Sequence, residues 1–248
     1  MIIRAVIFWF SLALLLVSWE MAILEPSRLL AWFGLTLAGS AISALHIGMR
    51  DKGFTRSFID RGSFVLLNVA IFWWLLWLDL AIVKFAFPVF LAFYIFYILR
   101  GVKNDGYGLF SEKNALIVFL GGTFFWSTIS FGLITVMGWQ LWHALLIFLA
   151  GFLIFSIVAI KKLAEDLREQ MRALVLLLLI AAEAFSVLVW LPSAEITLAL
   201  ELTIIVLFTY DLLKYFIDPE LIRKKIIAKK ILVYLAFFAI ALLSTSWQ

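Results

Sequence analysis

Two glutamates stand inside long apolar stretches of this sequence, at equal distances from a proline. Glu183 lies nine residues before Pro192, and Glu201 lies nine residues after it. If the two stretches form an antiparallel helix pair, a rise of about 1.5 Å per residue places both carboxyls about 13 Å below the connecting turn. Two carboxylates that meet in a low dielectric cannot both ionise without a counter-charge, so this pair is a candidate site for a shared proton or a cation. The alternative is that both are neutral acids with structural hydrogen bonds in the bundle.

Asp211 and Lys214 are a second pair of ionisable residues in an apolar stretch. They are three residues apart, so in a helix they lie on one face and can form an intramembrane ion pair. Such pairing is the least costly way to keep two charges near the edge of a bilayer. We expect a structural role for this pair.

A basic segment follows, and it opens with the residues of a helix start. Asp218 has the residue type of an N-cap, Pro219 that of the first helical position and Glu220 that of an acidic first turn. We expect a short helix in the headgroup layer whose charges contact anionic lipids, or else a segment whose lysines only orient the chain. The basic residues of the segment are Arg223, Lys224, Lys225, Lys229 and Lys230.

Several kinds of chemistry lack the residues that they need. The chain has no cysteine and two histidines, His46 and His143, which the topology below places near opposite membrane faces, so they cannot hold a metal ion or a haem together. The sequence has no Asp-x-x-Asp pair, no glycine-rich phosphate loop, no Gly-x-Ser-x-Gly motif and no His-Glu-x-x-His motif. We expect no metal, no cofactor, no catalytic residue and no nucleic-acid partner, and we favour a protein that is not an enzyme.

The composition shows which elements must position these residues. Of 248 residues, 66% are hydrophobic and 15% are charged, with a mean hydropathy of +1.13. Ordinary soluble domains are roughly 45–50% apolar and 25% charged, so this chain has too few polar residues to cover the surface of a soluble fold. We therefore predict an all-α, polytopic integral membrane helix bundle.

Nine apolar runs are long enough to cross a bilayer, which takes about 20 residues. We expect them to form a single transmembrane domain over residues 1–248. The stretch from Ser63 to Leu99 would be about 55 Å long as one helix, so it is divided at Asp79. The predicted spans are 4–24, 29–49, 63–78, 80–99, 115–137, 139–160, 173–191, 193–217 and 231–247.

The basic residues predict the orientation, because cytoplasmic loops of membrane proteins carry an excess of Lys and Arg. With the N-terminus cytoplasmic and the C-terminus outside, only Arg28 and Lys84 of the 20 basic residues lie outside. Merging the third and fourth spans would place the later basic loops on the wrong side. Between the sixth and seventh spans, acids and bases from Lys161 to Arg172 are four residues apart, and we expect this segment to extend the sixth helix into water.

The stretch from Glu183 to Lys225 resembles a known group of proteins. It combines an acid in mid-helix, the turn Trp190-Leu191-Pro192 and a basic segment after the next span. In these features it is similar to an uncharacterised family of small multi-pass bacterial membrane proteins, described only as a domain of unknown function. The resemblance covers about one sixth of the chain. It implies a protein of the bacterial inner (cytoplasmic) membrane and supplies no activity.

Three classes of function fit these features. The favoured one is a non-enzymatic integral membrane subunit or scaffold, because the loops are short and small residues that favour helix packing recur in the spans. The second is a proton- or cation-coupled carrier of small solutes that uses Glu183 and Glu201. The third binds or processes a lipid-linked substrate at the basic cytoplasmic face. Expected partners are the lipid bilayer, anionic lipids, and a membrane-protein partner or a second copy of the chain.

Overall fold

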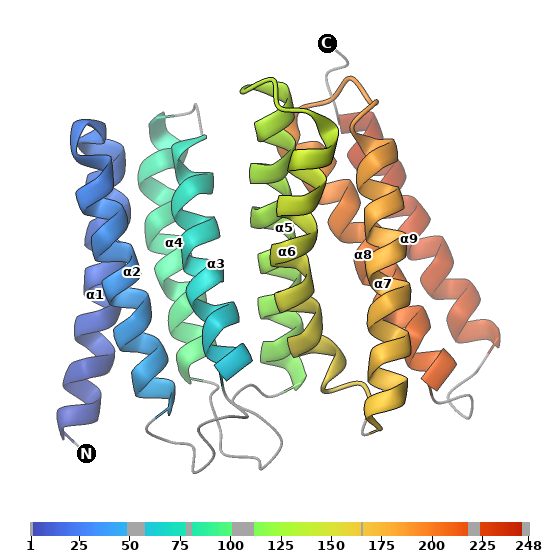
Figure 1. Ribbon diagram of the computed structural model, residues 1–248, viewed down its shortest axis with the longest axis horizontal. Coiled ribbons are helices and arrows are strands. Elements are labelled where there is room, and N and C mark those ends of the chain that lie inside the picture. The colour runs from blue at the N-terminus through green and yellow to red at the C-terminus, as the bar shows by residue number, and fades with distance from the viewer. Residues whose placement is uncertain are drawn as a thin grey trace. The chain divides into compact units, whose positions relative to one another are not determined.

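The computed structural model describes residues 2–48, 58–77, 81–100, 112–164, 166–217 and 224–244 (Figure 1). Within these ranges every regular element is helical, which confirms the predicted all-α class. Seven of the described helices are long and apolar enough to cross a membrane, as expected for a multi-pass membrane protein. They cover Val6–Leu24, Pro26–Leu45, Phe58–Leu76, Glu112–Thr135, Leu141–Ile160, Leu167–Leu188 and Glu195–Ile217.

The internal contacts divide the chain into two compact units, Met1–Val118 and Phe119–Gln248. The first contains four α-helices and the start of a fifth, and Figure 1 shows its helices running alternately up and down. The elements of this unit are α1 (Ile2–Leu24), the short 3-10 helix η1 (Pro26–Arg28), α2 (Leu29–Gly48), α3 (Phe58–Leu76), α4 (Ala81–Arg100) and the first turns of α5 (Glu112–Thr135).

α1 is the centre of the first unit, since it packs against α2, α3 and α4. Leu15 and Trp19 of α1 are fully buried, and so are Phe64 and Phe72 of α3. The hydroxyls of Ser18 in α1 and Thr36 in α2 form a hydrogen bond of 2.8 Å between the two helices. A proline turn at η1 joins α1 to α2.

The second unit contains the rest of α5, α6 (Leu141–Ile160), α7 (Leu167–Leu188), α8 (Glu195–Ile217) and α9 (Lys224–Ser244). Consecutive helices pack from α6 to α9. The ring of Phe185 in α7 stacks on Phe131 of α5 and Phe148 of α6, with centroids 4.4 and 4.8 Å apart. Aromatic side chains pack directly on Gly122 of α5 and Gly151 of α6. A Cβ atom on Gly122 would lie 2.5 Å from the ring of Phe155.

Two expectations about local elements are wrong. The segment after Ile160 does not extend the sixth helix, because α6 ends there and a turn follows. Asp166 then caps α7, its carboxylate accepting a hydrogen bond of 3.3 Å from the backbone N–H of Arg168. The basic residues from Lys224 onward form the first turns of α9 rather than a separate helix in the headgroup layer. Residues 218–223 of that expected helix lie outside the described residues.

Candidate functional site

Glu201 lies on the buried side of α8, six residues after the helix begins at Glu195. Its side chain is 0% exposed, and its neighbours Leu198 and Leu202 are buried with it. Neither carboxyl oxygen of Glu201 has a hydrogen-bond partner in the described structure. An ionised carboxylate in such surroundings costs several kcal/mol. Glu201 is therefore stable there as the neutral, protonated acid or with a cation bound beside the carboxylate.

Glu183 lies in different surroundings. The buried face of α7 is made of small and aliphatic residues and Phe185, whereas Glu183 is on the exposed face. No hydrogen bond joins the carboxyls of Glu183 and Glu201, since both oxygens of Glu201 are without a partner. The structure therefore does not bring the two glutamates together as one site with a shared proton. They are two separate acidic positions of the α7–α8 hairpin.

Beyond the charges of residues 168–172 at the start of the helix, the exposed face of α7 is otherwise apolar. Exposed residues four apart along the helix form this face: Met171, Val175 and Leu179 precede Glu183, and Val187 follows it. These four apolar side chains are 53%, 50%, 57% and 66% exposed. We call Met171, Val175, Leu179, Glu183 and Val187 the α7 face. It places one carboxyl in the middle of a row of hydrophobic side chains.

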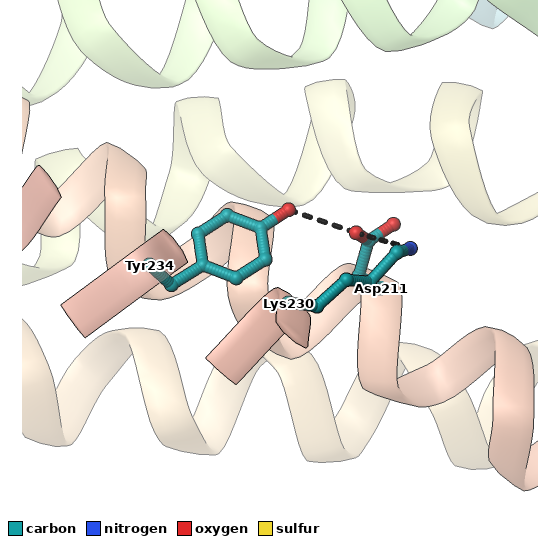
Figure 2. A network of polar contacts seen from close by, with 3 residues as sticks. All are labelled: Asp211, Lys230 and Tyr234. Carbon is teal, nitrogen blue, oxygen red and sulfur yellow. Dashed lines mark hydrogen bonds and ion pairs between the residues drawn. The ribbon is translucent and has the colours of Figure 1, made fainter. Parts of the chain in front are cut away.

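Asp211 belongs to a polar network between α8 and α9 (Figure 2). The Nζ atom of Lys230 and the hydroxyl of Tyr234 both donate hydrogen bonds of 2.8 Å to Oδ2 of Asp211. The side chains of Asp211 and Lys230 are 16% and 38% exposed, so water only partly reaches this ion pair. Lys214, the partner expected from the sequence, lies with its Nζ atom 5.2 Å from the ring centroid of Tyr210.

The network with α9 was not predicted. Lys230 and Tyr234 are four residues apart, so they share a face of a helix, and this spacing is the only signal of it in the sequence. Lys230 was instead expected to contact anionic lipids, but the charge of Lys230 is already paired with Asp211. Of the other residues expected to do so, Lys229 is exposed on α9, the side chains of Lys224 and Lys225 are outside the described residues, and Arg223 is as well.

The remaining candidates do not form a metal site in the described residues. His143 is exposed at the start of α6, next to the ring of Trp139, and the side chain of His46 lies outside the described residues. Among the described side chains there is no group of three or more His, Cys, Asp or Glu that could hold a metal ion.

The first unit carries an apolar groove between α1 and α4. Its volume is about 370 Å³, and Trp9, Leu16, Val89 and Phe93 are among the side chains that line it. The ring of Trp9 also stacks on Phe96 at 5.5 Å between centroids. A lining of this kind suits a hydrocarbon chain and offers nothing to orient a polar ligand.

No protein-family model, no curated protein and no solved structure matches this chain. The resemblance to a family of bacterial membrane proteins therefore stays a prediction, and the site has to be interpreted from its own chemistry.

Proposed function

We propose that the chain crosses the bacterial inner membrane nine times, with its N-terminus cytoplasmic and its C-terminus outside. Seven spans are the helices of sufficient length and hydropathy described above. The other two are α4, with 20 residues, and α9, with 21 residues. At a rise of about 1.5 Å per residue each is about 30 Å long, which equals the thickness of the hydrocarbon layer. The charge asymmetry of the loops supports this orientation.

We infer that the protein acts as a non-enzymatic membrane subunit that binds its partner through the α7 face. The observation that carries this proposal is the exposed carboxyl of Glu183 between the apolar side chains of Leu179 and Val187. A carboxyl that faces lipid at this depth costs several kcal/mol even when it is neutral, because lipid tails offer it no hydrogen bond. A partner helix that covers the α7 face and supplies a donor removes this cost.

The charges of α7 favour a different protein over a second copy of this chain. Between Arg172 and Trp190 the sequence of this helix has no basic residue. Two copies that met at the α7 face would bring two carboxyls together with no basic side chain, so they could pair only when at least one is protonated, whereas a basic residue of another protein pairs with the ionised form. The partner that fits is a transmembrane helix with a Lys, Arg or hydroxyl side chain at the depth of Glu183.

Photo-crosslinking in intact membranes tests this proposal. A photoreactive amino acid replaces Leu179 or Val187 on the α7 face, and Leu146 of α6, which is 66% exposed, is the matched control position. We expect adducts from the two α7 positions to a membrane span of one other protein, and no such adduct from position 146. The crosslinked span should contain a basic or hydroxyl residue.

The effect of removing the Glu183 carboxyl on the adduct yield distinguishes specific docking from chance proximity. Hydrogen bonds between transmembrane helices are worth about 1–2 kcal/mol in model peptides, so Glu183→Leu should lower the adduct yield roughly tenfold. Adducts to lipid alone, to a second copy, or to residues 1–118 of the same chain would each contradict the proposal. An adduct whose yield does not change in Glu183→Leu would contradict it as well.

A further inference from the structure

Three residues of the second unit have buried polar atoms without a hydrogen-bond partner. Among the described residues of that unit these atoms are the hydroxyl oxygens of Ser156 and Ser193 and both carboxyl oxygens of Glu201. Buried polar groups in native proteins are nearly always hydrogen-bonded, and the exceptions need an explanation. A carboxyl with two unpartnered oxygens is the most costly exception of the three.

The three residues lie at successive depths. Ser193 is in the turn before α8, and Glu201 is about 9 Å along α8 from Glu195, at about 1.5 Å per residue. The hydroxyl of Tyr210 in α8 donates to the carbonyl of Ala159 in α6, at 3.4 Å. This contact places Ser156, three residues before Ala159, one to two helical turns deeper than Glu201. The unpartnered atoms thus lie at increasing depths below the outer turn, in the order Ser193, Glu201 and Ser156.

α5 supplies further oxygen atoms near the depth of Glu201. α5 and α8 run antiparallel, because Thr135 bonds Glu195 at one end and Phe119 packs on Tyr210 at the other. Glu201 is therefore level with the part of α5 that holds the buried residues Ser127, Thr128 and Ser130. These three hydroxyls donate to carbonyls of their own helix, at 2.9 to 3.1 Å, which leaves their oxygen lone pairs able to accept.

No other titratable side chain is hydrogen-bonded to Glu201. The segment 119–135 of α5 has no titratable residue, and α6 has only His143, exposed at its outer end. α7 carries Glu183 on its exposed face and the charges of residues 168–172 at its inner end. Besides Glu201, the titratable groups on α8 and α9 are Glu195, Tyr210, Asp211, Lys214, Tyr215, Lys224, Lys225, Lys229, Lys230 and Tyr234. Among the described side chains, none of these charges is therefore paired with the Glu201 carboxyl through a hydrogen bond.

We propose that Glu201 is a proton-binding site and that its proton exchanges with the outer aqueous side. A proton neutralises a single carboxylate without further ligands, whereas a metal cation requires several oxygen ligands around it, and none of the described hydroxyls is hydrogen-bonded to the Glu201 carboxyl. The outer side is the nearer one, since Glu201 is six residues from the start of α8 and 16 from its end at Ile217. The hydroxyl of Ser193 lies on that side. This site is independent of the docking proposed for the α7 face, and the assignment of its nearer side as the outer one rests on the proposed nine-span orientation.

Infrared spectroscopy of the full-length chain in phosphatidylcholine vesicles tests the site, with the proton itself as the probe. The signal is the C=O stretching band of protonated carboxyls at pH near 7. All measurements use a Glu183→Gln background, so that the exposed carboxyl contributes nothing. We expect a band that disappears on adding Glu201→Gln and shifts in position with Glu201→Asp. Replacing H₂O by D₂O should move this band to lower frequency.

Several results would overturn the proposal. A spectrum that Glu201→Gln leaves unchanged would show that this carboxyl holds no proton. A band that never shifts in D₂O would show a sealed structural acid, and a band that sodium removes at constant pH would show a metal-cation site. For the route, Ser193→Ala should slow the D₂O shift several-fold, whereas Ser186→Ala, whose hydroxyl bonds the carbonyl of Ala182, should not. Equal rates in both variants would overturn the outer route.

Discussion

Asp211 shows at the scale of single residues how this protein keeps charge inside an apolar bundle. One carboxyl oxygen accepts hydrogen bonds from an ammonium group and from a phenol hydroxyl, both contributed by α9 (Figure 2). Charge-assisted hydrogen bonds are the stronger kind, and partial burial limits their screening by water. The network therefore adds two directional contacts between α9 and α8 to the packing of their side chains.

Lys230→Met should destabilise the protein by about 1–3 kcal/mol, because it removes one partner of a half-buried ion pair and leaves Asp211 with the Tyr234 hydroxyl only. The measurement is thermal unfolding in detergent micelles. Lys229→Met is the matched control, one residue away on the exposed side of α9, and should leave the unfolding temperature unchanged. Equal effects of the two substitutions would show that the ion pair contributes nothing to stability.

The two glutamates show what could not be predicted for single residues. Their depth follows from helix geometry and the position of Pro192. Which way Glu201 faces does not, because apolar residues surround it on every side of α8 and a hydrophobic period is absent there. The buried position of Glu201 depends on packing between helices far apart in sequence. So does the network of Asp211, whose partners are 19 and 23 residues away.

At the scale of elements, the pair α5 and α6 is held by close approach at small residues. Trp126 of α5 donates its indole N–H to the carbonyl of Ile147 in α6, at 2.8 Å. The indole lies against Gly151, where a Cβ atom would be 2.3 Å from its nitrogen. Small residues at helix interfaces leave room for side chains of the neighbouring membrane helix. Glycine is required at position 151 because a larger residue would collide with the Trp126 indole, not because the backbone has an unusual conformation there.

Gly151→Ala should therefore destabilise the protein by about 1–3 kcal/mol, because the new methyl group displaces the indole of Trp126 and breaks its hydrogen bond. Gly34→Ala in α2 is the control, since no atom lies within 4 Å of its built Cβ. Thermal unfolding in detergent compares the two. A Gly151 variant as stable as the Gly34 variant would contradict the close packing of α5 on α6.

Most helices were predicted within a few residues because apolar runs and the charges between them follow from the bilayer thickness. The region between α6 and α7 was not, because its acids and bases have the spacing of a helix surface. Nothing in that spacing distinguishes a continuous helix from a new one. In the structure a new helix, α7, begins after Asp166, whose side chain caps it. The start of α9 was missed for the same reason, since Lys224 to Lys230 fit both an interfacial helix and the first turns of a span.

At the scale of the whole molecule, the proposed topology has nine membrane crossings. Length and hydropathy support seven of them among the described residues, and helix length alone supports α4 and α9. An odd number of crossings would place the two termini on opposite sides. With a cytoplasmic N-terminus and six crossings before it, the loop between α6 and α7 and its basic residues would lie in the cytoplasm. The proposed side from which the proton of Glu201 comes follows from this orientation.

The most direct test is the location of the C-terminus in cells. A reporter enzyme that is active only outside the cytoplasm is fused after Gln248, and the same reporter after Ala164, in the loop between α6 and α7, is the control. The nine-span account predicts an active reporter at Gln248 and an inactive one at Ala164. A reporter that is inactive at Gln248, while a cytoplasmic fluorescent protein at the same position is bright, would contradict it.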